Sequence, residues 1–467
     1  MKDKDYEYEI LLNTTRFRKS KIKRTIIDEF YSDRSRVLYC SSFRHLQQKA
    51  QVFSLESNSS VRTRMTHSLE VSDLGRTLAN SIGKKLCEND IISVDQIPQL
   101  VAVVENACLL HDIGNPPFGH FGEAAIRDWA DQNLSMLIPE KLQKCSQYSL
   151  LMSDFKEFDG NPQGIRTVTK LHTETDNSSL NLTYSTLLCM LKYSRAAGED
   201  ADKGILKKAG YFQTEKALVE KMFNEVGIKP HHRYPLTYIM EAADDIAYCL
   251  SDISDGIKKQ ILTSNDFLNE FNKTWEANWK GIKCPVTIPE VVASFNRDIS
   301  IPWSRQAVAE AVDNYINNHE QFYNGDAVEL IPQNSMGRVF DTIKKVSRKI
   351  LYTSVQAESI ELTGYAVITG ILRHYSRLLK MDIDDFTSLV DQEELSGFGL
   401  EKRLFNRLGK RYIKAYKYEL ERYKDHSDYQ TYEIWLRVHL IIDHVSGMTD
   451  DFALETYQML EGINLKR

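Results

Sequence analysis

Apolar residues recur at helical spacing through most of the 467-residue chain. In residues 65–88 a leucine or isoleucine returns every fourth position, and residues 97–111 repeat this pattern. Such a stripe marks one face of an amphipathic helix that packs against a core. The 22 glycines and 11 prolines are few for this length. The pattern therefore predicts an all-α protein with only minor β elements.

Further segments predict additional helices. Residues 235–256 have Pro235 where a first helical turn accepts proline and Gly256 where a helix commonly ends. The C-terminal third predicts helices over 336–353, 356–379, 400–423 and 427–446, with breaks at SGFGL and SGMTD. Short turns between long helices favour antiparallel packing. A short strand is predicted only in the stretch NSSLNLTY, residues 177–184.

Polar and basic stretches suggest how the chain is organised. Residues 1–33 are predicted to form an N-terminal segment that carries the basic run RFRKSKIKR. Residues 34–467 are predicted to form one large helical domain, with a candidate surface insertion at 257–300 where periodicity is weaker. A basic run is most often a solvated face or an anchor for a neighbouring subunit, and binding of single-stranded DNA or an effector nucleotide is the alternative.

Composition narrows the class of protein. No stretch of 18 apolar residues occurs, and the start MKDKDYEYEI lacks the apolar segment of a secretory signal, so we expect a cytoplasmic protein without a membrane span. Seven cysteines without a C-x-x-C pair favour reduced thiols. A net charge of −6 argues against a surface devoted entirely to nucleic acid.

Histidines and carboxylates gather at predicted helix ends. His67 lies near the start of the first helix, and the pair His111–Asp112 ends the second. The sequence GHFGE, directly after two prolines, adds His120 and Glu123. A lone histidine at a helix end is more often a capping or core residue. Any one of these groups alone therefore favours an ordinary structural role.

A fourth group makes the set look like a metal site. Asp244, Tyr248 and Asp252 lie four residues apart in EAADDIAYCLSD, so they share one helix face. Two imidazoles with two carboxylates suit Mn²⁺, Fe²⁺, Co²⁺, Ni²⁺, Mg²⁺ or Zn²⁺. Such a set leaves positions open on an octahedral ion for water and substrate, which favours hydrolysis.

These residues and the sequence around them resemble those of a known family. His67, His111–Asp112 and Asp244, in this order, resemble the H…HD…D signature of the HD-domain metal-dependent phosphohydrolases, an all-α superfamily. The blocks that more narrowly resemble bacterial deoxyguanosinetriphosphate triphosphohydrolases are RSRVLYCSSFRHLQQKAQVF, RTRMTHSLEV, HDIGNPPFGHFGE, FDGNPQGIR, KAGYFQTE, EAADDIAYCLSD and SGMTDDFA. They reach from residue 34 to 453. The resemblance implies an HD-domain helical core with additional helices.

The resemblance also implies an activity and a cofactor. The activity is hydrolysis of dGTP to deoxyguanosine and inorganic triphosphate. Whether other dNTPs are also hydrolysed is left open. His67, His111, Asp112 and Asp244 would hold one divalent ion. Mn²⁺ or Mg²⁺ is expected first, and Co²⁺, Ni²⁺, Fe²⁺ or Zn²⁺ is the alternative. His120 would act beside the α-phosphate as acid or base, with Glu123 orienting it. A homo-oligomer, hexameric or tetrameric, is also implied.

Substrate contacts carry over from the resemblance residue by residue. Gln51 and Tyr248 would border the sugar, with Asp252 near the 3′-hydroxyl, and a tight fit at Gln51 would exclude a 2′-hydroxyl. Arg64, Lys192 and Lys208 would supply the positive charge for the triphosphate. Asn161, Tyr193 and Glu361 would line the rest of the pocket. His45 and His444 depart from the residues common in the family, arginine and tyrosine, which leaves base selectivity and subunit contacts open.

Two other functions fit parts of the sequence. A different HD-type nucleotide phosphohydrolase remains an alternative, although the acidic pair typical of alarmone hydrolases and the GYP block of cyclic-dinucleotide enzymes are missing. A regulatory protein with a degenerate site that binds nucleotide or single-stranded DNA is the second alternative. Its support is the basic run and the Lys/Arg-rich stretch 402–417. The complete ligand set argues against it.

Overall fold

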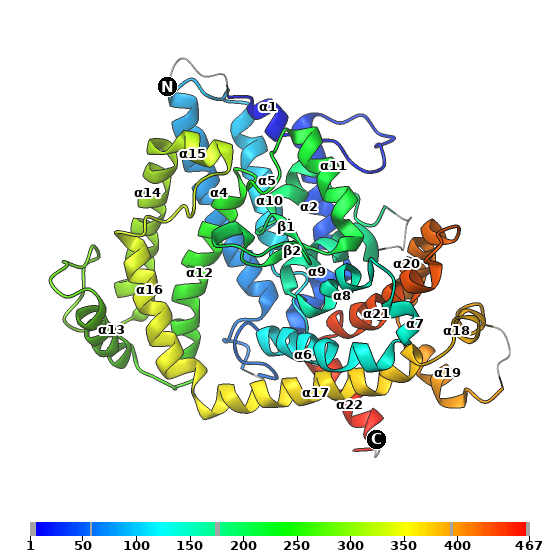
Figure 1. Ribbon diagram of the computed structural model, residues 1–467. Helices are drawn as coiled ribbons and strands as arrows, with labels where there is room; N and C mark the ends of the chain where they lie inside the picture. Colours follow the sequence, from blue (N-terminus) through cyan, green and yellow to red (C-terminus); the bar gives the residue numbers. More distant parts are fainter. Residues whose placement is uncertain (1–5, 57, 173–177, 393–395, 464–467) are drawn as a thin grey trace.

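The computed structural model describes residues 6–56, 58–172, 178–392 and 396–463, and helices make up most of it (Figure 1). This confirms the predicted all-α class. The strands within these ranges form one small parallel sheet of β1 (Arg195–Ala196) and β2 (Ala209–Tyr211). The strand predicted at 177–184 is wrong over its described residues, because Ser179 and Asn181 adopt positive φ angles, which turn the backbone.

The first of the two larger apolar cores is built mainly by helices from the first three quarters of the chain. Its members are α1 (Tyr8–Leu11), α2 (Ile26–Tyr39), α3 (Ser41–His45), η1 (Leu46–Gln48), α4 (Arg64–Glu88), α5 (Gln96–Leu110), α10 (Tyr184–Cys189), α11 (Lys216–Val226), α12 (Thr237–Lys258), α13 (Ser264–Asn278), η5 (Asn296–Ser300), α14 (Ile301–Asn317), α15 (His319–Asn324), α16 (Met336–Ser347) and η6 (Arg348–Tyr352).

The second core is built mainly by the C-terminal helices together with α6 and α8. Its members are α6 (Gly119–Leu137), α8 (Tyr148–Lys156), α17 (Val355–Leu379), α18 (Ile383–Val390), α19 (Gly399–Phe405), α20 (Lys410–Leu420), α21 (Tyr429–Ser446) and α22 (Asp450–Leu460). Short elements complete the fold: α7 (Glu140–Gln143), α9 (Gly160–Arg166), η2 (Thr167–Leu171), η3 (Gly204–Leu206), η4 (Gln213–Glu215) and η7 (Glu421–Tyr423). The long helix α17 runs beside α6 along one side of the molecule (Figure 1).

Three helices of the first core meet closely at Gly75 of α4. A Cβ there would lie 2.5 Å from the sulfur of Cys108 on α5 and 3.7 Å from Ala243 on α12. Any larger residue at position 75 would push α4 away from α5. The close approach brings together the parts of α4, α5 and α12 that carry the candidate ligands.

The helix predictions need two corrections. Helix α12 begins at Thr237, after Pro235, and continues through Gly256 to Lys258. Gly256 does not end the helix. Its lack of a side chain instead makes room for Leu351, which would lie 2.3 Å from a Cβ at this position. The stretch 400–423 is not one helix either: α19 ends at Phe405 and α20 begins at Lys410. The predicted helices at 65–88, 97–111, 356–379 and 427–446 are confirmed within a few residues.

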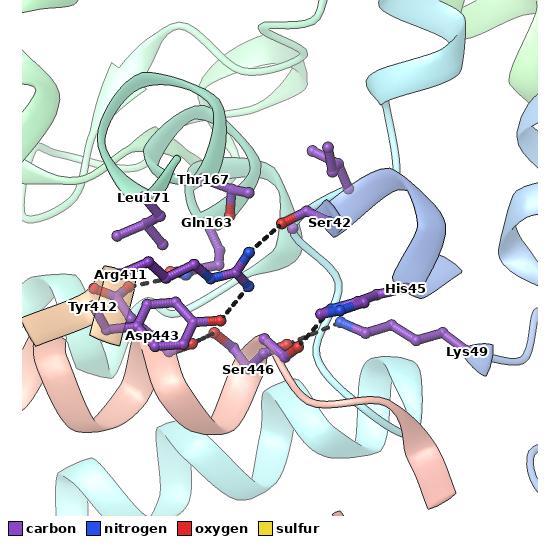
Figure 2. Close-up of a pocket in the computed structure, with 13 residues that line it drawn as sticks. Ser42, His45, Lys49, Gln163, Thr167, Leu171, Arg411, Tyr412, Asp443 and Ser446 are labelled. Carbon is purple, nitrogen blue, oxygen red and sulfur yellow. Dashed lines mark hydrogen bonds between the residues drawn. The ribbon is translucent and has the colours of Figure 1, made fainter. Parts of the chain in front are cut away.

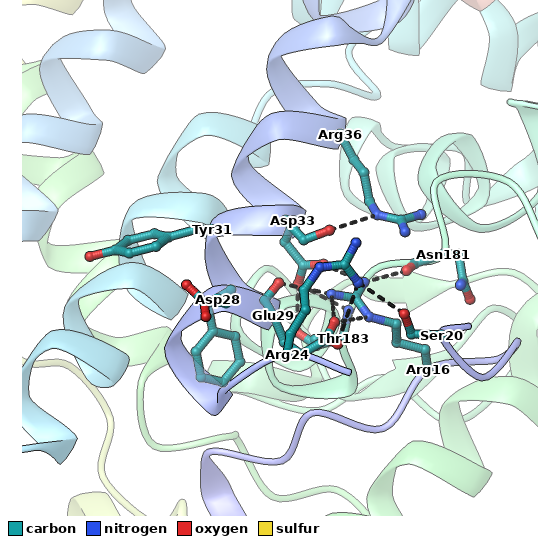
Figure 3. Close-up of polar contacts among 12 residues, drawn as sticks. Arg16, Ser20, Arg24, Asp28, Glu29, Tyr31, Asp33, Arg36, Asn181 and Thr183 are labelled. Atoms are coloured by element: carbon teal, nitrogen blue, oxygen red, sulfur yellow. Dashed lines mark hydrogen bonds and ion pairs between the residues drawn. The ribbon is translucent and has the colours of Figure 1, made fainter. Parts of the chain in front are cut away.

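Part of the basic run near the N-terminus lies inside the protein (Figure 3). Arg16 is only 6% exposed and forms ion pairs with Asp33 at 2.5 Å and Glu29 at 2.7 Å. Asp33 also accepts hydrogen bonds from the backbone N–H and the hydroxyl of Thr183. Arg16 therefore ties the segment before α2 to the segment before α10. Arg18, Lys19, Lys21 and Lys23 are exposed.

The predicted division of the chain at residue 33 falls within α2. Tyr8 and Leu11 from the N-terminal part are buried in the first core. The predicted insertion at 257–300 contains α13 and η5, and Phe267 and Phe271 of α13 pack into the same core. The domain division itself stays a prediction. No helix among the described residues is long and apolar enough to cross a membrane.

Candidate active site

Two histidines and an aspartate from three helices meet at one point. His67 lies in the first turn of α4, His111 directly follows α5, and Asp244 lies in the middle of α12. Their donor atoms all lie within 4.8 Å of one another. The Nε2 atom of His67 is 3.3 Å from Oδ1 of Asp244, and Nε2 of His111 is 3.5 Å from the same oxygen. The structure thus brings together three of the four predicted metal ligands.

The histidines are oriented as ligands would be. The backbone carbonyl of Cys108 lies 2.8 Å from Nδ1 of His111, which makes Nδ1–H the donor and leaves the lone pair on Nε2. This buried Nε2 has no hydrogen-bond partner among the described residues. His67 is completely buried. A buried, unpaired nitrogen that faces a carboxylate is what a bound cation would satisfy, so these residues fit a divalent ion.

Asp112, the fourth predicted ligand, lies beside the other three. Its Oδ2 atom is 3.6 Å from Nε2 of His111 and accepts a hydrogen bond from Arg64 at 2.7 Å. Its Oδ1 atom accepts a hydrogen bond from Asn115 at 2.6 Å. Burial alone would raise the pKa of Asp112, but the neighbouring His111 and Arg64 lower it to about 2. The carboxylate is therefore charged at neutral pH.

Asp244 and Lys192 influence each other's charge in the centre of the site. Burial alone would raise the pKa of Asp244, yet the interaction with His111 and the hydrogen bond to His67 hold it well below its ordinary value. Lys192 lies 3.7 Å from Oδ2 of Asp244. Burial would lower the pKa of this lysine, but Glu241 and Asp244 raise it. A fixed cation therefore stands next to the candidate metal ligands.

His120 and Glu123 form a pair at the start of α6. The chain turns there because Phe118 and Gly119 have φ angles of +61° and +56°. Nδ1 of His120 lies 2.9 Å from Oε2 of Glu123, and the other Glu123 oxygen accepts the backbone N–H of Gly160 at 2.8 Å. The bond to Glu123 raises the pKa of His120. The His120 side chain is 84% exposed while that of Glu123 is buried, so a fixed carboxylate orients a reachable imidazole.

A cavity of about 800 Å³ opens over these groups. Its size is within the range of small-molecule sites. Residues of both cores line it, among them Met240 from the first and Phe118 from the second. The predicted site residues in its wall are Gln51, Arg64, His111, Asp112, His120, Glu123, Asn161, Lys192, Tyr193, Lys208, Tyr248, Asp244 and Glu361.

Asp252 does not line this cavity, although it was predicted to contact substrate. It is 1% exposed, and its Oδ2 atom accepts a hydrogen bond from the hydroxyl of Tyr352 at 2.5 Å. Tyr352 also bonds the hydroxyl of Tyr248, and both tyrosines face the cavity. Burial raises the pKa of Asp252 to about 7. In this conformation Asp252 reaches the cavity through Tyr352.

Sequence reasoning missed Tyr352 and two cations near it, Lys344 and Arg348, which also line the cavity. The three residues lie four apart, so they share one face along α16 and η6, which is a signal that the sequence did contain. Lys344 is paired with Asp245 at 2.9 Å. Asp245, which also lines the cavity, is thus paired with a cation of α16.

In another part of the cavity wall, Asp159 holds Lys208 and Asn161 in place. Lys208 donates to Oδ2 of Asp159 at 2.6 Å, and Asn161 bonds Oδ1 of the same carboxylate. Gly114 lies against the backbone of α9, where a Cβ on it would be 2.0 Å from the backbone nitrogen of Gly164. The glycine of HDIGNPP therefore lets the chain after His111 pack against the helix that carries Asn161.

The two histidines that depart from the family pattern lie outside the cavity wall. His444 is buried between the rings of Tyr375 and Tyr412. His45 lies 3.3 Å from the carbonyl oxygen of Gly447. Neither residue contacts the candidate metal ligands.

Comparisons with known proteins agree with this geometry. Residues 64–158, which contain His67, His111 and Asp112, match the family described as HD domain. The chain is 33% identical over 488 residues to a deoxyguanosinetriphosphate triphosphohydrolase of Enterobacter sp., covering 95% of this chain and 96% of the relative. It is 34% identical over 490 residues to the protein of the same name from Salmonella typhimurium, covering 95% of each. The chain therefore belongs to the deoxyguanosinetriphosphate triphosphohydrolase family of HD domain proteins.

Proposed function

We propose that this chain hydrolyses dGTP to deoxyguanosine and inorganic triphosphate in a metal-dependent reaction. The observation that carries the proposal is the meeting of His67, His111 and Asp244 at one point, with His111 and Asp244 in the wall of a nucleotide-sized cavity, in a chain similar to triphosphohydrolases over 95% of its length. Hydrolysis of other dNTPs and the choice between Mn²⁺ and Mg²⁺ are parts of the same proposal.

The metal would be held by the helix-borne ligands. His67, His111 and Asp244 offer donor atoms on one side, and Asp112 lies close enough to join them after a small movement from Arg64. When bound, a divalent ion supplies positive charge for phosphate oxygens and makes water a better nucleophile at neutral pH. Mixed imidazole and carboxylate donors suit Mn²⁺ well and also accept Mg²⁺.

The triphosphate needs fixed cations. It carries about four negative charges near pH 7, and phosphoryl chemistry depends mostly on positioning and charge stabilisation. Arg64, Lys192 and Lys208 line one part of the cavity, around the histidines and Asp159. We assign the triphosphate to these three residues. Cleavage at the α-phosphorus, which the family resemblance implies, requires the α-phosphate to lie next to His111 and Asp244.

The leaving nucleoside needs a proton on its 5′-oxygen. His120 is exposed to the cavity, and its Nδ1 is held by Glu123. The raised pKa increases the protonated fraction near neutral pH. We therefore assign His120 as the general acid and Glu123 as the residue that orients it and stabilises its charged form.

The sugar and base occupy the remaining walls. Gln51 and Tyr248 border the sugar, and Tyr352 presents a hydroxyl that Asp252 holds in place. Asn161, Tyr193 and Glu361 complete the lining. A buried wall that fits a deoxyribose closely would reject a 2′-hydroxyl, because the extra oxygen would be left without a partner or without space.

The direct test incubates the purified protein with dGTP, each other dNTP and GTP, with Mn²⁺, with Mg²⁺ and with a chelator. Anion-exchange chromatography then separates the products. We expect deoxyguanosine and intact triphosphate from dGTP only when a metal is present, and slow turnover of GTP. Orthophosphate or pyrophosphate as the primary product would overturn the proposal. The Asp244→Ala variant, prepared in the same way, controls for contaminating phosphatases.

A further inference from the structure

The C-terminal segment SGMTD, residues 446–450, contacts two loops that border the cavity. The first is the 49–54 loop, which carries Gln51, and the second is the 114–119 loop, which leads into His120. The roles assigned above to the cavity residues use neither Asp450 nor Lys49. Both side chains are almost completely buried, at 3% exposure each.

Asp450 joins the two loops through a single carboxylate. Its Oδ2 atom accepts the backbone N–H of Ala50 at 3.0 Å, and its Oδ1 atom accepts the backbone N–H of Phe118 at 3.0 Å. Asp450 is the first residue of α22, but Thr449 already caps that helix by accepting the N–H of Phe452. The Asp450 side chain therefore bonds other segments and is not needed as the helix cap.

Lys49 makes a second connection among the same three segments. Its ammonium group donates to the carbonyl oxygen of Asn115 at 2.6 Å and to that of Ser446 at 2.9 Å. Figure 2 shows Lys49 and His45 reaching from the 45–49 segment toward the end of α21. Burial lowers the pKa of Lys49 to about 7, and the charge of Asp450 opposes this shift. Two buried polar side chains thus connect the two loops to the C-terminal segment.

The bonds of Asp450 and Lys49 fix the part of the cavity wall that carries Gln51. Ala50 directly precedes Gln51 and pairs with Thr63 in an isolated β-bridge, and the carbonyl of Lys49 accepts the N–H of Arg64 at 2.9 Å. The 49–54 loop is thereby tied to the first turn of α4, which carries Arg64 and His67.

The same bonds also fix the approach to His120. Phe118 lies two residues before His120 in a left-handed conformation, which is uncommon for a residue other than glycine. Its N–H bonds Asp450, and its ring packs so closely on α17 that a Cβ on Gly364 would lie 2.5 Å from it. Asn115, held by Lys49, in turn bonds Asp112.

We propose that Asp450 and Lys49 form a clasp that fixes the Gln51 wall relative to His120, so that both are positioning residues for catalysis and sugar selection. This inference rests on the proposed function. Catalytic groups act well only within a narrow range of geometry, so loosening the clasp should lower kcat and weaken the preference for a deoxyribose.

The test compares Asp450→Asn with Asp451→Asn. Asparagine keeps the shape but offers one acceptor in place of two, so one of the two backbone N–H groups loses its partner. Asp451 is exposed and lies in the same first helical turn, so its loss changes the charge at the helix end equally. We expect Asp450→Asn to lower kcat for dGTP by about 10- to 100-fold and to reduce the ratio of kcat/KM for dGTP over GTP. We expect Asp451→Asn to change neither by more than about twofold.

Hydrogen exchange without substrate or metal provides a second measurement. In Asp450→Asn, peptides from the 49–54 and 114–119 loops should both exchange faster than in the unchanged protein, whereas peptides from α12 should not. Asp450→Glu keeps two acceptor oxygens and should recover part of kcat and of the sugar preference, which distinguishes positioning from general loss of folding.

The outcomes separate the clasp from the activity. Equal kinetics and equal exchange in Asp450→Asn and Asp451→Asn would overturn the clasp. A loss of kcat with no change in exchange of either loop, or with no change in the dGTP over GTP ratio, would also overturn it. If the unchanged protein releases no triphosphate, the proposed function fails, while the exchange experiment still reports whether Asp450 holds the two loops.

Discussion

The cavity has two walls that are held in different ways. The helical wall is formed where α4, α5 and α12 pack together in one apolar core, at His111 directly after α5 and Asp244 on α12, with His67 of α4 buried behind them. The loop wall consists of residues 49–54 and 114–119, which are joined by Lys49 and Asp450. The helical wall gains its rigidity from many apolar contacts, whereas the loop wall depends on a few buried hydrogen bonds.

This difference suggests a division of labour. Close packing at Gly75 sets the spacing of the three ligand helices, and dense cores resist deformation. The loops must fit around a substrate, and loops tolerate small movements that packed helices do not. Damage to the helical wall should therefore abolish the reaction, while damage to the loop wall should reduce its rate and selectivity.

The largest effect is expected from Asp244→Ala. The carboxylate faces His67, His111 and Lys192, so its loss removes a proposed ligand and leaves Lys192 without this acidic neighbour. We expect Mn²⁺ binding measured by titration calorimetry to disappear and kcat to fall by about 10⁴-fold, the equivalent of several kcal/mol. Circular dichroism should still show the helical fold. Normal Mn²⁺ affinity in this variant would contradict the placement of the metal.

His120→Ala should have the next largest effect. A general acid contributes about 10²- to 10⁴-fold, so we expect kcat to fall within that range while Mn²⁺ affinity stays unchanged. Near-normal kcat would show that another group protonates the leaving oxygen.

The pH profile of Glu123→Gln sharpens this assignment. Because the Glu123 bond raises the pKa of His120, its loss lowers that pKa. An acid acts in its protonated form, so the rate falls as pH rises through the pKa, and in the variant this fall should begin at lower pH. A variant whose alkaline limb stays in place would contradict the pairing of His120 with Glu123.

A smaller effect is expected from Lys208→Met. Lys208 is partly exposed and is held toward the cavity by Asp159, so it should contribute mainly to binding. Loss of one charged hydrogen bond to phosphate corresponds to an increase of about 10-fold in KM, with little change in kcat. Lys207→Met, at the neighbouring lysine in the cavity wall, provides the comparison. An unchanged KM for Lys208→Met would place the triphosphate elsewhere.

Tyr352→Phe should have the smallest effect. The change removes the hydroxyl that joins Asp252 to the cavity but keeps the ring. One hydrogen bond is worth about 1 kcal/mol, so we expect kcat/KM for dGTP to fall roughly fivefold. Substrates without a 3′-hydroxyl should be affected less. An equal loss for 2′,3′-dideoxy-GTP would argue against contact between this hydroxyl and the sugar.

The helices of the helical wall could be predicted from their apolar stripes, and the loop wall only in part. The proposed ligands, which the family resemblance implied, lie at the ends or on the faces of such helices, for example α4 and α5. Predicting the clasp would require knowing that Asp450 meets Phe118, 332 residues away, and Ala50, 400 residues away. No local pattern encodes such pairings. The same limit explains why Asp252 was expected in the cavity while Tyr352, 100 residues later, stands in front of it.

The most direct test of the central claim is hydrolysis of dGTP in ¹⁸O-enriched water with Mn²⁺, followed by mass spectrometry of both products. If the helical wall directs water to the α-phosphorus, one ¹⁸O atom enters the inorganic triphosphate and deoxyguanosine stays unlabelled. Label in the 5′-hydroxyl of deoxyguanosine, or label in released orthophosphate or pyrophosphate, would contradict the placement of the α-phosphate beside His111 and Asp244.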